Sequence, residues 1–370
     1  MELEGWRIMN GAWHFPLRSG WMMGMIILAA CASVPGKDND VGIWKPTTLI
    51  GVTLRARAIA VGPQGDIWAV LPRTSEGKRP LVRSADRGAT WTTITLQLIT
   101  QDTYYCDVLV VDREDCAWAY TTAWGLSRFS PNGDILTTTG LSQSPPPGYP
   151  TLLVASPDGY VYKIGLGIGL TRIGMNGEMR TTWPDIGGMM TFDLAVDAHG
   201  DLFALGAHLC RSKDGGLTWE RLYHGDVSEP LDLICLESDG TIYILDLRRI
   251  FRSTDSGKTW TNLPVLCETR QGELYGLPDG SLAGAVWRTP RDAFPHPYGL
   301  FRSWDKGNTW EEWVPGIAKE DIEYGGVLAT YGDRIVYAYF QFVAGKESQS
   351  GLYRMVLPQR AGADKAWLKY

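Results

Sequence analysis

Apolar residues occur in short blocks along most of the chain, separated by glycine- or aspartate-centred turns. Residues 192–196 and 201–205 flank one such turn, and residues 231–236 and 241–245 flank another. Short apolar blocks bounded by turns are typical of β-strands that are buried on both faces. The same paired layout recurs at residues 59–70, 108–120, 152–164, 274–286 and 327–339. The pattern therefore predicts a chain built from repeated β-hairpins.

A short phrase follows each hairpin: a small loop residue, then Leu, Ile or Val, one further residue and an arginine. The seven arginines are Arg83, Arg128, Arg172, Arg211, Arg252, Arg302 and Arg354. The recurrence of this phrase along the chain, marked by the seven arginines, indicates a repeat architecture. We predict that the phrase is a third strand and that a more polar fourth strand follows, as at residues 91–96 and 219–223. Seven units of four antiparallel strands predict an all-β fold, the seven-bladed β-propeller.

The start of the repeat region contains a strand without a hairpin of its own. Residues 43–49 match the fourth-strand pattern of residues 90–96 and precede the first repeat. We predict that this segment becomes the outer strand of the last blade and so closes the ring. Residues 42–370 are then expected to form a single propeller domain.

Composition is that of a folded protein: 44% of the residues are hydrophobic and 21% are charged. The formal net charge is −6 and no lysine-rich run is present, which argues against nucleic-acid binding. Neither a metal-ligand cluster nor a phosphate-binding loop is visible, so we expect no metal and no cofactor. We also expect the protein to be a monomer. Without a C-x-x-C pair, buried free thiols are the expectation for Cys106, Cys116, Cys210, Cys235 and Cys267.

The N-terminal region has the layout of a secretory signal. Arg18 precedes the apolar run 21–28, which is too short to cross a membrane as a helix. The following Leu28-Ala29-Ala30-Cys31 resembles the bacterial lipobox. This resemblance implies that residues 1–30 are a lipoprotein signal peptide and that Cys31 is lipidated. Residues 31–41 are then a tether. The implied protein is a periplasmic or outer-membrane-anchored lipoprotein that touches the membrane only through its lipid. Ordinary export, an unprocessed N-terminus and a start at Met9 instead of Met1 remain alternatives.

Four repeats continue into Ser-x-Asp-x-Gly-x-Thr-Trp. The copies contain Ser84, Asp86, Gly88 and Trp91; Ser212, Asp214, Gly216 and Trp219; Ser253, Asp255, Gly257 and Trp260; and Ser303, Asp305, Gly307 and Trp310. This motif resembles the Asp-box or BNR repeat of sialidases, sortilin-type receptors and the photosystem II assembly-factor family. In those families the box lies between the third and fourth strands, away from the substrate-binding face. The resemblance implies that these residues are structural.

The residue types in the motif explain such a role. An aspartate can accept hydrogen bonds from turn N–H groups, and glycine supplies the positive φ that a tight turn requires. Seven equivalent arginines, one in each repeat, cannot each form a separate active site. We therefore expect the seven arginines to pair with neighbouring carboxylates or carbonyls.

Function is expected on the opposite face, in the loops that follow the second and fourth strands. Three second-to-third-strand loops look enlarged, at residues 71–80, 287–298 and 341–350, in blades that neighbour each other in a closed ring. Aromatic residues beside arginines favour protein or sugar binding. The candidate binding residues are Trp287, Arg288, Arg291, His296, Tyr298, Arg73, Arg79 and Lys346. The alternative is that these loops are merely exposed polar insertions.

The sequence does not support sialidase chemistry, because Leu54-Arg55-Ala56-Arg57-Ala58 occupies the place of that family's Phe/Tyr-Arg-Ile-Pro motif and sialidases have six blades. Asp-box enzymes that cleave xyloglucan pair two propellers, whereas one is expected here. No spacing selects a catalytic pair among Asp292, Glu320, Asp321, Glu323 and Glu347. The favoured hypothesis is a non-catalytic scaffold or binding module for a protein partner or a glycan. A glycoside hydrolase or polysaccharide lyase is the alternative.

Overall fold

The computed structural model describes most of the chain between residues 41 and 358. The ranges outside it are 1–40, 51–58, 72–78, 99–108, 122–124, 141–150, 166–168, 184–190, 225–230, 247–248, 265–272, 287–298, 332–333 and 359–370. The described residues all belong to one compact unit.

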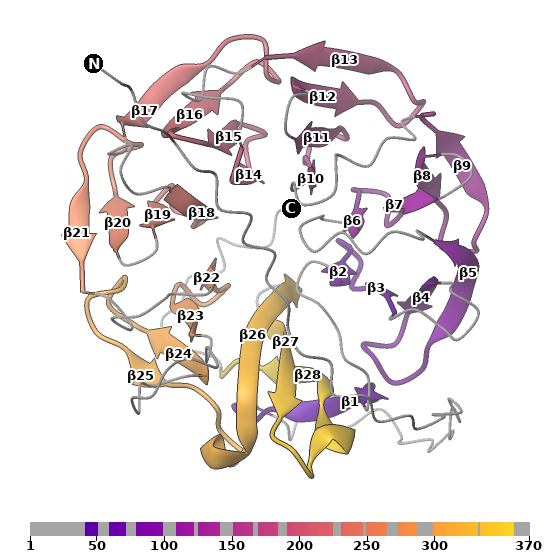
Figure 1. Cartoon of the computed structure of the whole chain (residues 1–370), viewed down its shortest axis with the longest axis vertical. Helices are drawn as coiled ribbons and strands as arrows, with labels where there is room; N and C mark the ends of the chain where they lie inside the picture. Colours follow the sequence, from indigo (N-terminus) through magenta and orange to yellow (C-terminus); the bar gives the residue numbers. More distant parts are fainter. Residues whose placement is uncertain are drawn as a thin grey trace, which may run out of the picture. The chain divides into compact units, whose positions relative to one another are not determined.

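Seven blades of four antiparallel strands form a ring (Figure 1). Blade 1 is β2 (Ile59–Val61), β3 (Ile67–Val70), β4 (Arg79–Ser84) and β5 (Thr92–Leu98). Blade 2 is β6 (Leu109–Val111), β7 (Ala117–Thr121), β8 (Gly125–Phe129) and β9 (Ile135–Thr138). Blade 3 is β10 (Thr151–Ala155), β11 (Val161–Gly165), β12 (Gly169–Ile173) and β13 (Met179–Thr182). Blade 4 is β14 (Asp193–Val196), β15 (Leu202–Leu205), β16 (His208–Ser212) and β17 (Glu220–His224).

Blade 5 is β18 (Leu231–Leu236), β19 (Ile242–Asp246), β20 (Ile250–Ser253) and β21 (Thr261–Leu263). Blade 6 is β22 (Glu273–Gly276), β23 (Leu282–Val286), β24 (Gly299–Ser303) and β25 (Glu311–Glu312). Blade 7 is β26 (Ile322–Tyr331), β27 (Ile335–Phe342), β28 (Gly351–Val356) and β1 (Lys45–Ile50). The prediction of a seven-bladed β-propeller is confirmed.

β1, the first strand of the described residues, closes the ring, as predicted. β1 runs antiparallel to β28, with Lys45 opposite Arg354 and Pro46 opposite Tyr353. Trp44, directly before β1, is buried between blades 6 and 7. Its indole Nε1 donates a hydrogen bond to the Trp313 carbonyl at 3.2 Å, and its ring meets the ring of Phe340 edge-on. The two ends of the propeller are thus held in one blade.

The core lies between neighbouring blades. The second strands are buried on both sides, as in β3, β11 and β15. Each blade presents apolar residues to both of its neighbours, which accounts for the near-continuous apolar blocks of the sequence. Large aromatic side chains fill much of this space, and Trp68, Trp118 and Tyr243 have no exposed surface. Packing between blades therefore supplies the hydrophobic core.

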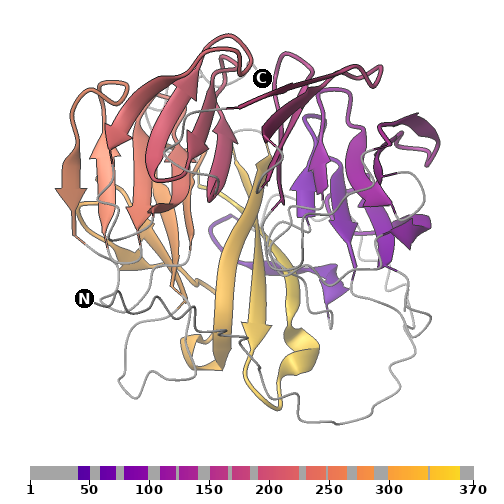
Figure 2. The same cartoon turned by 45° about the horizontal axis from the view of Figure 1, so that its top comes forward.

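Antiparallel connectivity divides the connections between two faces of the ring. Turns between first and second strands and loops between third and fourth strands lie at one end of every blade, which we call the turn face. Loops between second and third strands, and the connections from one blade to the next, lie at the other end, the loop face (Figure 2).

Helical structure in the described ranges is limited to two 3₁₀ turns, η1 (Lys319–Asp321) and η2 (Glu347–Gln349), both on the loop face of blade 7. No helix in these ranges has the length and apolar character needed to cross a membrane. Cys116 and Cys235 are buried free thiols, as expected, and Cys210 is buried as well. Cys31, Cys106 and Cys267 lie outside the described residues.

Candidate functional site

The four repeated loops on the turn face share one hydrogen-bond pattern. We call residues 84–91, 212–219, 253–260 and 303–310 the Ser-Asp loops. In the first, the Ser84 hydroxyl donates to the Asp86 carboxylate at 2.8 Å and accepts the Gly88 N–H at 2.8 Å. The same carboxylate accepts the N–H and the hydroxyl of Thr90. The other three loops repeat these bonds around Asp214, Asp255 and Asp305.

These hydrogen bonds keep the carboxylates ionised. Bonds from Thr218 and Thr259 lower the pKa of Asp214 and Asp255, the latter to about 2. Bonds from Thr309 lower the pKa of Asp305 in the same way. A carboxylate held ionised by several donors is poorly suited to release a proton as a general acid. Backbone geometry adds a second constraint, because Gly88 has φ +88°, a conformation that strains other residues.

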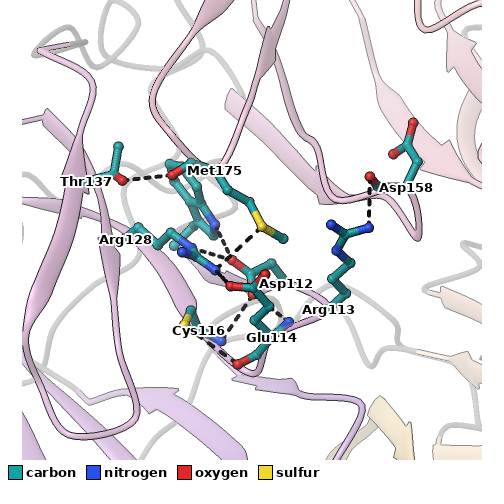
Figure 3. A network of polar contacts seen from close by, with 9 residues as sticks. Asp112, Arg113, Glu114, Cys116, Arg128, Thr137, Asp158 and Met175 are labelled. Carbon is teal, nitrogen blue, oxygen red and sulfur yellow. Dashed lines mark hydrogen bonds and ion pairs between the residues drawn. The ribbon is translucent and has the colours of Figure 1, made fainter.

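Arg128 is at the centre of a charged network on this face (Figure 3). Its Nε donates to Asp112 and its Nη2 to Glu114, both at 2.7 Å, and the side chains of Arg128 and Asp112 are 7% and 2% exposed. Asp112 also accepts the indole N–H of Trp118 at 2.9 Å. Nη2 further contacts the Met175 sulfur in blade 3 at 3.7 Å. The network therefore ties a third strand to its own first turn and to the next blade.

Other repeated arginines take equivalent positions. Arg83, Arg211 and Arg302 pair with Asp66, Asp201 and Asp279 in the first turn of the same blade. Arg252 donates to the Lys306 carbonyl in the next blade at 2.9 Å. The expected pairing with carboxylates or carbonyls is confirmed for these and for Arg128. Arg172 differs, since its guanidinium lies over the Tyr160 ring, 4.1 Å from the centroid.

Polar contacts on the turn face also join successive blades. The Thr48 hydroxyl bonds the Gly88 carbonyl between blades 7 and 1, Arg113 bonds the Asp158 carbonyl between blades 2 and 3, and Arg180 bonds the Gly215 carbonyl between blades 3 and 4. Between blades 5 and 6, the Lys306 ammonium contacts Glu237 at 2.6 Å and Asp239 at 2.9 Å. Burial raises the pKa of Glu237, while Lys306 opposes that rise. Many polar and charged groups of the turn face thus form contacts that hold neighbouring blades together.

The described part of the loop face is concentrated in blade 7. The Lys346 ammonium contacts the Asp321 carboxylate at 2.5 Å, which joins the 343–350 loop to η1. The Glu347 carboxylate accepts the Gly345 N–H at 2.9 Å, and the Ser350 hydroxyl accepts the Phe342 N–H at 2.9 Å. Glu320, Glu323 and Glu347 are exposed beside this pair. The loop is therefore preorganised, and solvent or a ligand can reach Glu347 on it and Glu320 and Glu323 on the neighbouring η1 and β26.

Of the predicted binding residues, Lys346 is the one whose side chain the structure describes. Trp287, Arg288, Arg291, His296, Tyr298 and Arg73 lie outside the described residues, and Arg79 is placed only as the first residue of β4. The flanking strands nevertheless fix where two loops leave the ring. β23 ends at Val286 and β24 begins at Gly299, so residues 287–298 connect strands at the loop face of blade 6. Residues 72–78 connect β3 and β4 at that face of blade 1.

The Glu237–Lys306 contact could not be predicted from the sequence. Its partners are 69 residues apart, and Glu237 occupies a turn position held by different residue types in other blades. Within the described ranges, no group of three or more His, Cys, Asp or Glu residues could hold a metal ion.

Comparisons with known proteins agree with the fold. No protein-family model matches the chain. A probable oligoxyloglucan-reducing end-specific xyloglucanase from Neosartorya fischeri is 26% identical over 161 residues, 40% of this chain and 18% of that protein. The match thus spans less than a fifth of that relative's length.

Three solved structures share the architecture at low identity. Virginiamycin B lyase from Staphylococcus aureus superposes with a TM-score of 0.58 and 16% identity, covering 85% of this chain and 98% of that one. The GH74 enzyme of Niastella koreensis gives 0.57 and 14%, covering 83% and 55%. YCF48 bound to a D1 peptide gives 0.56 and 16%, covering 86% and 98%. At these identities the likeness establishes the propeller fold alone.

Proposed function

We propose that this chain is an exported, lipid-anchored propeller that binds a protein or glycan through its loop face without catalysing a reaction. The observation that carries this proposal is the unequal use of polar groups on the two faces. Carboxylates of the Ser-Asp loops accept hydrogen bonds within their own loops. On the loop face of blade 7, Glu347 is exposed on the 343–350 loop and Glu320 is exposed on η1. Rigid scaffolds that present varied loops commonly bind through those loops.

The proposed binding region is the part of the loop face formed by blades 6, 7 and 1. Lys346 and the segments that contain Trp287, Arg291, Tyr298 and Arg73 belong to these three neighbouring blades. Aromatic and arginine side chains favour binding to protein surfaces and can stack on sugars. The Ser-Asp loops are interpreted as Asp-boxes that hold the blades, and Cys31 is proposed as the site of the lipid.

A glycan-active enzyme is the second candidate, and the partial match to a probable xyloglucanase favours it. The two candidates differ in turnover. We expect the purified protein to release no product from xyloglucan oligosaccharides, sialosides or bacterial polysaccharides, measured by reducing ends and by absorbance of unsaturated sugars.

The matched control uses carboxylates on both faces. Turnover that is lost in Glu347→Gln or Glu320→Gln and retained in Asp214→Asn would overturn the binding-only proposal. If all three variants are folded and none releases product, the binding-only proposal is supported.

A further inference from the structure

A buried carboxylate, Glu237, lies where blade 5 meets blade 6 on the turn face. This contact, between the turn 237–241 of blade 5 and the Ser-Asp loop 303–310 of blade 6, is called the 5–6 joint. The Glu237 side chain is 4% exposed, and its Oε2 accepts hydrogen bonds from the Tyr243 hydroxyl at 3.1 Å and the Lys306 ammonium at 2.6 Å. Its Oε1 is buried, and no described residue donates to it. Burial without a full set of donors disfavours an ionised carboxylate.

A second carboxylate of the same turn shares the Lys306 ammonium but remains open to water. Asp239 is 47% exposed and lies 2.9 Å from the ammonium, and it also accepts the Thr241 N–H at 3.0 Å. Partial burial acts to raise the pKa of Asp239, but the bonds from Lys306 and Thr241 outweigh it and lower that pKa. At Glu237 burial outweighs Lys306 and raises the pKa above its ordinary value of 4.5. The two carboxylates therefore lose their charge at different pH values.

The neighbouring groups of blade 5 and Lys306 keep one protonation state between about pH 5 and 8. Burial raises the pKa of the Tyr243 phenol on β19 and of the Cys235 thiol on β18, so both stay neutral. Burial acts to lower the pKa of Lys306, but its two carboxylate partners raise it, so it stays a cation. Glu237 is thus the group whose charge changes in this range.

Two further residues complete the surroundings of the 5–6 joint. Arg252 on β20 donates to the Lys306 carbonyl at 2.9 Å, and a guanidinium stays charged in proteins. Gly276 on β22 faces Glu237 from blade 6, where a Cβ would lie 3.1 Å from the Glu237 Cγ. Neither residue changes its charge between about pH 5 and 8.

Within the described ranges, buried carboxylates also cross two other joints, where they accept backbone N–H groups. Asp115 accepts the Gln64 N–H between blades 1 and 2, and Asp193 accepts the Ile234 N–H between blades 4 and 5. A backbone donor is fixed in its strand or turn. The Lys306 side chain is 34% exposed, so its ammonium can exchange the Glu237 contact for water. The 5–6 joint is therefore held by a contact that can open locally.

We propose that the 5–6 joint is a proton-linked latch, which is tight when Glu237 is protonated and loosens when Glu237 is ionised. In the tight form Asp239 holds the Lys306 ammonium, and the neutral Glu237 is buried at lower cost. In the ionised form, separation of the 303–310 loop from the turn of blade 5 returns the Glu237 charge to water. The latch does not depend on what the loop face binds.

The direction of the pH response follows from linkage. A carboxyl whose pKa is higher in the closed joint than in water favours the closed joint as pH falls. The closing contribution of Glu237 is complete below its ordinary pKa of 4.5 and is lost as pH rises through the raised value. Asp239 and Asp305, whose pKa values are lowered, stay ionised over this window.

Amide hydrogen exchange of the full chain between about pH 5 and 8 tests the latch, with each rate divided by the intrinsic chemical rate at that pH. Protection of residues 237–241 and 303–310 should fall about three- to tenfold as pH rises, since one unit of pKa difference corresponds to about tenfold. The matched loop is 212–219 of blade 4, where Arg180 of blade 3 donates to the Gly215 carbonyl. Because neither group titrates in this range, protection of that loop should not change.

Three variants separate Glu237 from other causes of a pH response. Glu237→Gln keeps the shape of the side chain but cannot ionise, so its protection should not change with pH. Glu220→Gln, at an exposed position of β17, should respond like wild type. Lys306→Met removes the cation that opposes the raised pKa of Glu237, so the midpoint of its response should move to higher pH.

The latch is overturned if Glu237→Gln responds like wild type, or if the 212–219 loop changes as much as the 303–310 loop. Wild-type protection that is constant over the pH range would overturn it as well, as would a midpoint that moves to lower pH in Lys306→Met. If Glu237→Gln does not fold, the comparison of the two loops within the wild-type protein still decides.

Discussion

Replacing Arg128 by methionine is expected to lower the free energy of unfolding by about 3–5 kcal/mol. The substitution removes the cation that neutralises Asp112, whose side chain is 2% exposed. Trp118 and the backbone N–H groups of Glu114 and Cys116 still donate to that carboxylate, but these neutral donors do not replace the positive charge that neutralises it. Denaturant unfolding followed by tryptophan fluorescence measures the change.

Two further variants separate the buried charge from simple loss of packing. Lys319→Met removes an exposed pair with Glu312 and should cost less than about 1 kcal/mol. Arg128→Met combined with Asp112→Asn should recover part of the loss, because the uncompensated charge is gone. Equal losses for Arg128→Met and Lys319→Met would contradict the importance of burial in this network.

Replacing Trp44 by alanine is expected to lower the free energy of unfolding by about 3–5 kcal/mol. The ring is 2% exposed and lies 5.1 Å from the Trp313 ring and 5.3 Å from the Phe340 ring, between centroids. These contacts connect the segment before β1 to blades 6 and 7, so their loss weakens ring closure as well as the core. Thermal and denaturant unfolding both measure this loss.

Trp183→Ala is the matched control for this substitution. That side chain is 69% exposed, so its removal should change the free energy of unfolding by no more than about 0.5 kcal/mol. Similar destabilisation by the two substitutions would mean that Trp44 does not close the ring in solution.

The blades could be predicted from the sequence because each is encoded locally. A hairpin, an arginine phrase and a polar fourth strand recur together, and β1 could be assigned to the last blade because residues 43–49 have a fourth-strand pattern with no hairpin before them. The fourth strands are less regular than predicted. β25 contains only Glu311–Glu312, because the chain then turns inward to bury Trp313.

The candidate site was harder to predict because its contacts are not local. Lys346 and Asp321 are 25 residues apart, and neither lies in a repeated position. The sequence indicated enlarged loops in three blades, yet loop length alone does not determine which side chains meet. Arg172 shows the same limit within the repeat, since its ring contact with Tyr160 replaces the carboxylate pairing of Arg128.

The two faces are interpreted as having separate tasks. Hydrogen bonds and ion pairs of the turn face hold loops and blades together. The loop face of blades 6, 7 and 1 then presents its polar side chains to a partner. This division predicts that charge changes on the loop face alter partner binding and that equivalent changes on the outer wall do not.

Partner capture by the full chain tests this claim most directly. The measurement compares wild type with Glu320→Lys/Glu347→Lys on the loop face and with Glu220→Lys on β17, an exposed position on the outer wall. We predict that crosslinked partner recovered from cells falls at least about tenfold for the loop-face variant, a change of about 1.4 kcal/mol. Recovery with Glu220→Lys should equal wild type. Undiminished recovery with the loop-face variant, or an equal fall with Glu220→Lys, would show that the partner does not bind the loop face of blade 7.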